Sequence, residues 1–289
     1  MELFVQSLVT GIMLGGLYAV IGIGLTLVFG IMGLTNIAHG DLMILGSFFV
    51  MVIASTTGNV WIALAVGIVI MIIVGGLSQK FLINKVIDKG AEPALLITFG
   101  MSIVIKNVLQ LIFGADSMRI PSPFSSVNVI NTKWVNISGQ YFFNFIVAIV
   151  VILVLNYIIK KTDFGRSIRA AASNVVGAEL MGVNTKRTYI YAMGIALATG
   201  CIAGLLVGQS FVFYSYSGTQ YLIIAFGVVV IGGMGSLVGT LLGGIILGVA
   251  QLMGAYFLGT GYQIVIGYLT LIVILTFRPR GLMSNMVRK

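Results

Sequence analysis

Two ionisable residues, His39 and Asp41, lie in a short polar segment, residues 30–46, between two long apolar stretches. His39 is the only histidine of the chain, and Asp41 is one of seven acidic residues. Apolar sequence resumes directly after Asp41, so we expect the segment at or inside membrane depth. A charge there is costly unless it faces a cavity or a partner. A single histidine cannot supply the usual ligand set of a metal site. Without enzyme features elsewhere in the chain, transport is the leading class of function.

A second interruption lies at residues 232–236, where three of five residues are glycine. Such a segment is a poor helix interior and predicts a junction of two half-helices, whose N-terminal ends attract a carboxylate. Interrupted segments in both halves of a chain indicate a transport site; tight helix packing alone is the alternative. The residues that we assign to the translocation path or gate are Asn36, His39, Gly40, Asp41, Lys106, Gly232, Gly233, Gly235 and Ser236.

Lys106 belongs to a row of polar residues in the apolar stretch 94–114, together with Thr98, Ser102 and Gln110. Their spacing of four places them on one face of a helix. A lysine this far from a helix end has difficulty reaching water, so the row should face protein or a water-filled cavity. Lys106 is expected to line the route, to pair with an acid such as Asp41, or to make a structural polar contact.

The composition defines the class of protein: 59% of the residues are hydrophobic and 8% are charged, against about 25% charged in soluble domains. We predict an all-α polytopic membrane protein, with one transmembrane domain over residues 1–289, about 8–9 transmembrane helices and two interrupted or re-entrant segments. No phosphate-binding loop or nucleophile–base pair is recognisable, so we expect neither an enzyme nor a cofactor bound by this chain. The predicted apolar segments are 4–29, 38–55, 60–79, 94–114, 142–159, 189–212, 220–235, 237–257 and 262–277.

The basic residues predict the orientation in the membrane. Three lie in residues 80–92, six in 160–188 and four after residue 277. The positive-inside rule places these segments in the cytoplasm, with the N-terminus outside, the C-terminus inside and the loop 115–141 external. The rule also explains the net charge of +9 without nucleic acid. The first interruption then lies near the cytoplasm, which favours an inner gate over direct contact with a substrate.

The cytoplasmic segment 160–188 contains the elements of a docking site. Small residues permit close approach, and Arg166 and Arg169 share one helical face. A partner ATPase is one expected occupant; a basic helix lying on anionic lipid is the alternative. The residues that we assign to ATPase coupling are Gly165, Arg166, Arg169, Ala172, Gly177, Glu179 and Gly182.

Four motifs, taken in order along the chain, resemble the branched-chain amino acid ABC transporter permeases of the LivH type. Residues 35–41, Thr-Asn-Ile-Ala-His-Gly-Asp, resemble the Asn-x-Ala-His-Gly signature of that family. Residues 165–172 resemble its cytoplasmic coupling segment, 230–236 its late glycine-rich motif and 278–282 its usual ending. Two departures concern Ser173-Asn174, where many members have an acid, and Lys106, where an uncharged polar residue such as glutamine is expected.

The resemblance implies a subunit of an ATP-driven importer for branched-chain or other hydrophobic amino acids, in a bacterial cytoplasmic membrane. Its implied partners are a second permease, related or identical, two cytoplasmic ATP-binding subunits that use the ATP, and an external substrate-binding protein. Related permeases carry urea or short amides, which stays an alternative substrate class. From the residues alone, a stand-alone channel or ion-coupled carrier is the alternative mechanism.

Overall fold

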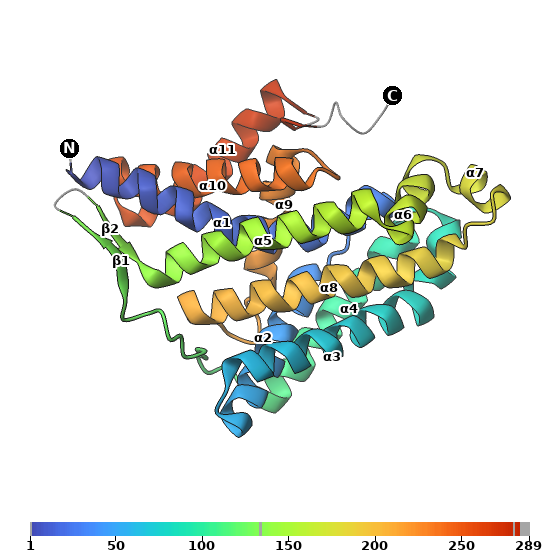
Figure 1. Ribbon diagram of the computed structural model, residues 1–289, viewed down its shortest axis with the longest axis horizontal. Helices are drawn as coiled ribbons and strands as arrows, with labels where there is room; N and C mark the ends of the chain where they lie inside the picture. Colours follow the sequence, from blue (N-terminus) through green and yellow to red (C-terminus); the bar gives the residue numbers. More distant parts are fainter. Residues whose placement is uncertain (1, 133–134, 280, 284–289) are drawn as a thin grey trace.

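The computed structural model describes residues 2–132, 135–279 and 281–283. Within these residues, eight helices are long and apolar enough to cross a membrane, which confirms the predicted polytopic all-α class (Figure 1). Three basic residues of the charge argument, Arg280, Arg288 and Lys289, lie outside the described residues. The eight helices are α1 Glu2–Met32, α2 His39–Thr57, α3 Val60–Phe81, α4 Ala91–Phe113, α5 Gly139–Lys161, α8 Thr185–Ser210, α10 Leu237–Leu258 and α11 Gln263–Phe277.

Short 3-10 turns extend or precede two of these helices. They are η1 Ile83–Lys85 and η2 Ile87–Lys89 after α3, and η3 Thr260–Tyr262 before α11. Helix α3 is long enough for a membrane span by itself, at 22 residues, whereas α11 has 15 residues and the segment reaches 18 with η3 included.

Helices α1 and α8 form the centre of the bundle, and most of their apolar spans are buried. Helix α1 packs against α10, α8, α5 and α9. Glycines make the α1–α10 contact close: a Cβ added at Gly15 or Gly248 would overlap the backbone of the other helix. This is the small-residue packing that replaces the hydrophobic effect between helices in lipid.

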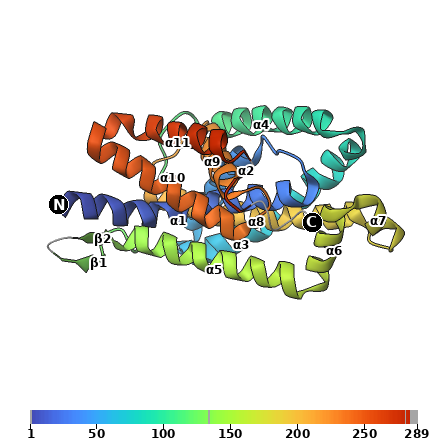
Figure 2. The same cartoon turned by 90° about the horizontal axis from the view of Figure 1, so that it is seen from above.

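The outer helices α4 and α11 leave most of their apolar surface uncovered (Figure 2). Leu96 and Leu111 on α4 and Ile272 on α11 are examples of exposed large side chains. A soluble protein rarely leaves so large a continuous apolar surface exposed, whereas lipid or a second membrane subunit covers it at no cost.

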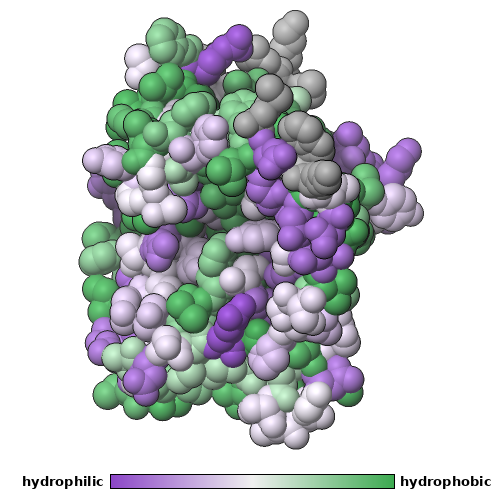
Figure 3. All heavy atoms as spheres, turned by 90° about the vertical axis from the view of Figure 1, so that its left-hand side faces the viewer, coloured by the Kyte–Doolittle hydropathy of each residue, from purple (hydrophilic) through white to green (hydrophobic). Residues whose placement is uncertain are grey.

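The two ends of the bundle differ in structure (Figure 1). The N-terminus lies beside a hairpin of β1 Asn128–Asn131 and β2 Asn136–Ser138, which the sequence did not indicate. The Gln6 side chain holds the hairpin through two hydrogen bonds with the backbone of Asn136, each 2.7 Å long. On the face at this end, hydrophilic residues are scattered among hydrophobic ones (Figure 3). The opposite end carries two short helices, α6 Asp163–Ser173 and α7 Val175–Leu180.

Both predicted interruptions are present. Helix α1 ends at Met32, residues 33–38 have no regular structure, and α2 begins at His39. The second interruption separates α9 Gly218–Gly232 from α10. At 15 residues, α9 is about 22 Å long, too short for roughly 30 Å of hydrocarbon. It runs across the direction of α1 and α8 in Figure 1, so α10, not α9, is the spanning helix of this pair.

Candidate functional site

The connection between α1 and α2 is folded by polar contacts. The side-chain oxygen of Asn36 accepts a hydrogen bond from the amide of Ala38 at 3.0 Å, and its carbonyl accepts one from the amide of His39 at 3.2 Å. These bonds form a turn of the Asx type, which starts α2. Thr98 of α4 accepts a bond from the amide of Ile37 at 3.3 Å. Asn36 is buried, and its two hydrogen bonds fix the backbone of this turn.

Asp41 is the centre of a polar cluster that joins three helices. Its Oδ2 accepts a hydrogen bond from Ser102 of α4 at 2.6 Å and lies 3.7 Å from the ammonium of Lys106, one turn further along α4. That ammonium donates to Thr219 Oγ1 at the start of α9, at 2.7 Å. Of the alternatives for Lys106, pairing with Asp41 is the arrangement that the structure contains.

The accessibility of the cluster is uneven. The Asp41 side chain is 2% exposed and that of Lys106 is 29% exposed. Asp41 Oδ1 is buried and has no hydrogen-bond partner among the described residues. The cationic end of the pair therefore reaches the molecular surface while the carboxylate stays inside.

His39 faces away from this cluster, because residues two apart on a helix point in nearly opposite directions. Its ring is buried between α1 and α8, with Nε2 3.4 Å from the carbonyl oxygen of Ile21. A Cβ added at Gly24 would lie 2.6 Å from the ring carbon Cε1. Nδ1 has no partner in the described part of the chain. His39 and Asp41 thus contact different helices, despite their proximity in sequence.

The start of α2 lies further inside the bundle than the charge distribution indicated. Ser102, which binds Asp41, is at the middle of α4, and Thr199, beside His39 and Gly24, is near the middle of α8. The reason is that residues 33–38 turn back between the helices after α1 has ended. The start of α2 thus lies beside the middle of α4 and α8, whereas the charge distribution predicted a position near the ends of the helices.

Two residues that the sequence did not single out complete this site, Gly218 and Thr219. A Cβ at Gly40 would overlap the carbonyl oxygen of Gly218, and a Cβ at Gly218 would overlap the Asp41 carboxylate. The N-terminal ends of α2 and α9 therefore meet at Asp41. No local signal marks Thr219, because 113 residues separate it from Lys106.

The second interruption is not part of this cluster, because it lies at the other end of α9. Gly233 and Gly235 both have positive φ, 101° and 86°. Ser236 caps the N-terminus of α10, and its Oγ accepts a hydrogen bond from the amide of Gly239 at 3.1 Å. Gly232 packs its backbone against that of Gly239. The structure thus groups Gly232, Gly233, Gly235 and Ser236 with one another, and apart from Asp41.

The C-terminal residues close this second region. The amide of Leu282 donates to the carbonyl oxygen of Ile231 at 3.0 Å, and the amide of Met283 donates to that of Gly232 at 3.1 Å. These bonds satisfy carbonyl groups that the end of α9 leaves free.

The seven residues assigned to ATPase coupling lie on α6, α7 and the turn that follows. Gly165 is needed for the corner between α5 and α6, because a Cβ there would overlap the carbonyl of Ile159. Arg169 donates to that same carbonyl oxygen. Arg166 pairs with Asp163 on the surface. Of the remaining four, Ala172 is exposed and Gly177 is half-buried. The amide of Gly177 donates to the side chain of Asn174, which caps the start of α7. Gly182 has a φ of 83°, and the fourth residue is Glu179.

Glu179 and two exposed apolar residues, one at the end of α7 and one directly after it, complete this end. The Glu179 carboxylate accepts a hydrogen bond from Thr185 at 2.5 Å, which ties α7 to the start of α8. Leu180 is 83% exposed and Met181 is 85% exposed. Exposed apolar side chains at an end of the bundle form a surface that a partner can cover.

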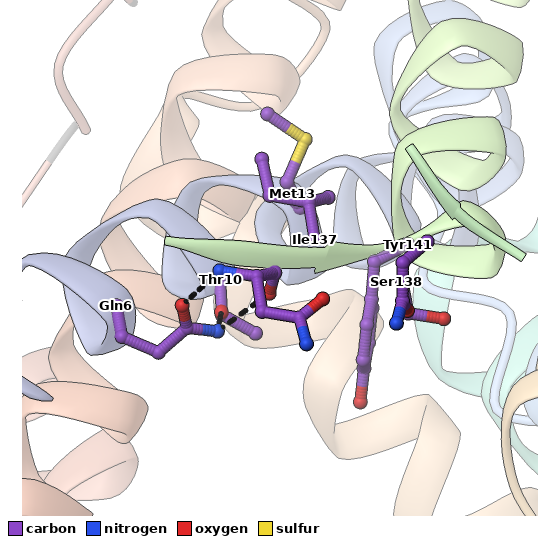
Figure 4. A pocket seen from close by; sticks show the side chains of 8 residues that line it. Gln6, Thr10, Met13, Ile137, Ser138 and Tyr141 are labelled. Atoms are coloured by element: carbon purple, nitrogen blue, oxygen red, sulfur yellow. Dashed lines mark hydrogen bonds between the residues drawn. The ribbon is translucent and has the colours of Figure 1, made fainter. Parts of the chain in front are cut away.

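A separate cavity of about 300 Å³ lies at the N-terminal end of the molecule (Figure 4). Its lining comes from the start of α1, including Gln6 and Thr10, and from the hairpin and Tyr141. Of the eight described residues that line it, none is charged: five are polar, Tyr141 is aromatic, and Met13 and Ile137 are apolar. The cavity is remote from Asp41, since the hairpin lies at the end of the bundle.

Comparison with known proteins agrees with the motifs. The family described as "Branched-chain amino acid transport system / permease component" matches residues 7–275. The high-affinity branched-chain amino acid transport system permease protein LivH of Salmonella typhimurium is 32% identical to this chain, over 98% of it and 96% of its own length. BraD of Pseudomonas aeruginosa, a permease protein of the same description, is 29% identical over 98% of this chain and 96% of its own length.

A more distant relative is the ribose import permease protein RbsC of Haemophilus influenzae, 24% identical over 80% of this chain and 71% of its own length. The family match spans nearly the whole bundle, including both interruptions and the α6–α7 segment. The chain belongs to the family of branched-chain amino acid transport permease components.

Proposed function

We propose that this chain is the membrane subunit of an ATP-driven importer of branched-chain or other hydrophobic amino acids in a bacterial cytoplasmic membrane. The observation that carries the proposal is the family match over residues 7–275, supported by relatives that are named as branched-chain amino acid transport permease proteins. The proposed partners are a second permease, two cytoplasmic ATP-binding subunits and an external substrate-binding protein. The α6–α7 end faces the cytoplasm, and the N-terminal end faces outwards.

The proposed docking surface for the ATP-binding subunits is the exposed side of α6 and α7. It combines the apolar Leu180 and Met181 with the basic Arg166. Since Arg169 and Gly165 fix α6 on the end of α5, movement of this surface is transmitted to the bundle. Nucleotide-driven closure would then rock the helices around the two interruptions, which gives alternating access.

Leu180→Asp tests the docking surface. It removes an exposed apolar contact and adds a charge, so we expect less recovery of the ATP-binding subunits on purification and lower uptake. Ala91→Asp, which adds the same charge at an exposed position at the start of α4, outside α6 and α7, is the matched control and should leave both unchanged. Arg169→Glu should also weaken coupling, but through the α5–α6 corner. Full recovery and full uptake in Leu180→Asp would contradict the assigned surface.

The gate is tested by His39→Leu and Asp41→Leu. Both side chains are buried where α2 meets its neighbouring helices, so we expect lower uptake while the chain still inserts into the membrane. Insertion is measured by protease protection of membrane vesicles, and uptake with labelled leucine. Normal uptake by both variants would remove the two residues from the mechanism.

The importer model is tested by reconstitution of the chain with and without its partners. Flux is expected only with the ATP-binding subunits and ATP present. Robust flux through the chain alone, without ATP, would identify a channel or ion-coupled carrier instead.

A further inference from the structure

Lys106 is a cation on a helix surface that is otherwise apolar. Its neighbours Ile103, Val104 and Val108 on α4 are exposed, and the Lys106 side chain itself is 29% exposed. A charged group at the middle of a spanning helix is costly against lipid and is found facing protein or a water-filled path. This part of α4 therefore faces the second subunit or the route between subunits.

The Lys106 ammonium has unused capacity to donate hydrogen bonds. An ammonium carries three donors, and among the described residues its one hydrogen bond is to Thr219, at 2.7 Å. The distance of 3.7 Å to Asp41 Oδ2 is an ion-pair distance and exceeds that of a hydrogen bond. Asp41 Oδ2 is instead bonded to Ser102. A further anionic group can thus approach the ammonium from the exposed side.

We propose that Lys106, positioned by Thr219, binds the α-carboxylate of the amino acid as it passes through the permease. The inference rests on the proposed import function and narrows its substrate class. Urea and short amides have no carboxylate and gain nothing from this cation, so they are excluded as the principal cargo.

Asp41 has a defined part in this site. In the empty permease its carboxylate neutralises Lys106 at 3.7 Å, so no isolated charge remains within the membrane. An arriving carboxylate competes with Asp41 for the ammonium, and Asp41 regains the ammonium when the cargo leaves. A transport site needs this balance, because cargo must bind well enough to enter and weakly enough to leave.

Uptake of labelled L-leucine by cells that carry the complete transport system as their only leucine importer tests the proposal. Lys106→Met should lower the uptake rate roughly 10- to 100-fold, because it removes one hydrogen bond between charged groups. Lys106→Arg, which keeps the charge, should retain most of the uptake. Lys89→Gln, which removes a surface charge at the end of the bundle, is the control. Recovery of the complex and its ATP hydrolysis should be unchanged in all of them.

The double variant Asp41→Asn/Lys106→Met separates carboxylate binding from simple charge balance. It leaves no unpaired charge, so it tests the site even where Lys106→Met alone is poorly folded. The reference is Asp41→Asn alone, because loss of the Asp41 carboxylate is itself expected to lower uptake. Leucine uptake at least roughly 10-fold below that of Asp41→Asn, with normal complex recovery, supports the carboxylate site. Uptake equal to that of Asp41→Asn would mean that Lys106 serves only as the counter-ion of Asp41 and would overturn this site alone. Import of urea or an amide, but of no amino acid, by the wild-type complex would overturn the proposed cargo as well.

Discussion

Side chains from other helices hold the α1–α2 connection, whereas backbone contacts hold the α9–α10 connection. At the first, Thr98 binds the amide of Ile37, and Ser102 binds the carboxylate of Asp41. At the second, Gly232 lies against Gly239, and the Cα of Gly30 lies near Gly235. Both are interruptions between apolar helices, yet they use different forces.

The difference separates two tasks in one membrane protein. A junction made by side-chain hydrogen bonds and charges can exchange partners when a polar molecule arrives. A junction made by backbone-to-backbone contact leaves no space for a side chain, and so fixes the relative position of two helices. We infer that cargo chemistry is concentrated at the first junction and shape at the second. Four predictions test this contrast.

The largest effect is expected for Gly232→Val. A Cβ at this position would overlap the carbonyl of Gly239, so α9 and α10 must move apart. We expect a loss of about 3 kcal/mol of stability, measured as the midpoint of thermal unfolding in detergent and as folded yield. The matched control is Gly100→Val on α4, where an added Cβ has no heavy atom within 4 Å. Equal midpoints for the two variants would contradict the backbone-contact description.

Ser102→Ala should have the next largest effect, because it removes the 2.6 Å hydrogen bond to the buried carboxylate of Asp41. The free energy of unfolding is expected to fall by about 1–2 kcal/mol, and uptake is expected to fall as well. Ser47→Ala is the control: this buried serine donates to the carbonyl of Met43 in its own helix at 3.3 Å, so its loss should cost less. A smaller effect at Ser102 than at Ser47 would argue against the Asp41 cluster.

The spans and both interruptions could be predicted from the sequence, because apolar length and glycine clusters are local signals. The Asp41–Lys106 pair was one of several alternatives, since a four-residue row on α4 defines a face but not what that face contacts. Thr219 could not be predicted, because its contact with Lys106 depends on how α9 crosses the bundle. The depth of His39 was also missed, since the positions of basic residues define helix ends and not the path of residues 33–38.

The α9–α10 junction shows the same limit. The glycines at 232–236 predicted a break, but periodicity does not tell a short re-entrant helix from a full span. The hairpin was missed because its strands, β1 and β2, are only 4 and 3 residues long. For the coupling residues, sequence spacing indicated a shared face for Arg166 and Arg169. In the structure, Arg169 binds the end of α5 and Arg166 pairs with Asp163.

A change from serine to aspartate distinguishes the two junctions further. Ser236 accepts a hydrogen bond from the amide of Gly239 at the start of α10. Ser236→Ala should therefore lower the free energy of unfolding by about 1 kcal/mol, and Ser236→Asp should keep most of that stability. Ser102 donates to a carboxylate, and Ser102→Asp would place a second acid beside Asp41. Thermal unfolding of these variants checks the prediction. Equal recovery by aspartate at both sites would show that the two serines have the same role.

The smallest effect is expected for Gly33→Asn in the α1–α2 connection. Gly33 has φ of 65°, and an added Cβ would meet nothing within 4 Å. Asparagine tolerates this left-handed conformation better than most other side chains. The free energy of unfolding is therefore expected to fall by at most about 0.5 kcal/mol. Gly235→Asn is the matched variant in the other junction, with φ of 86° and Gly30 Cα 3.2 Å from the added Cβ. Both positions carry a similar backbone strain, so the difference in their unfolding midpoints measures the packing alone. If Gly33→Asn is as destabilising as Gly235→Asn, the first connection is as tightly packed as the second, and the division between chemistry and shape does not hold.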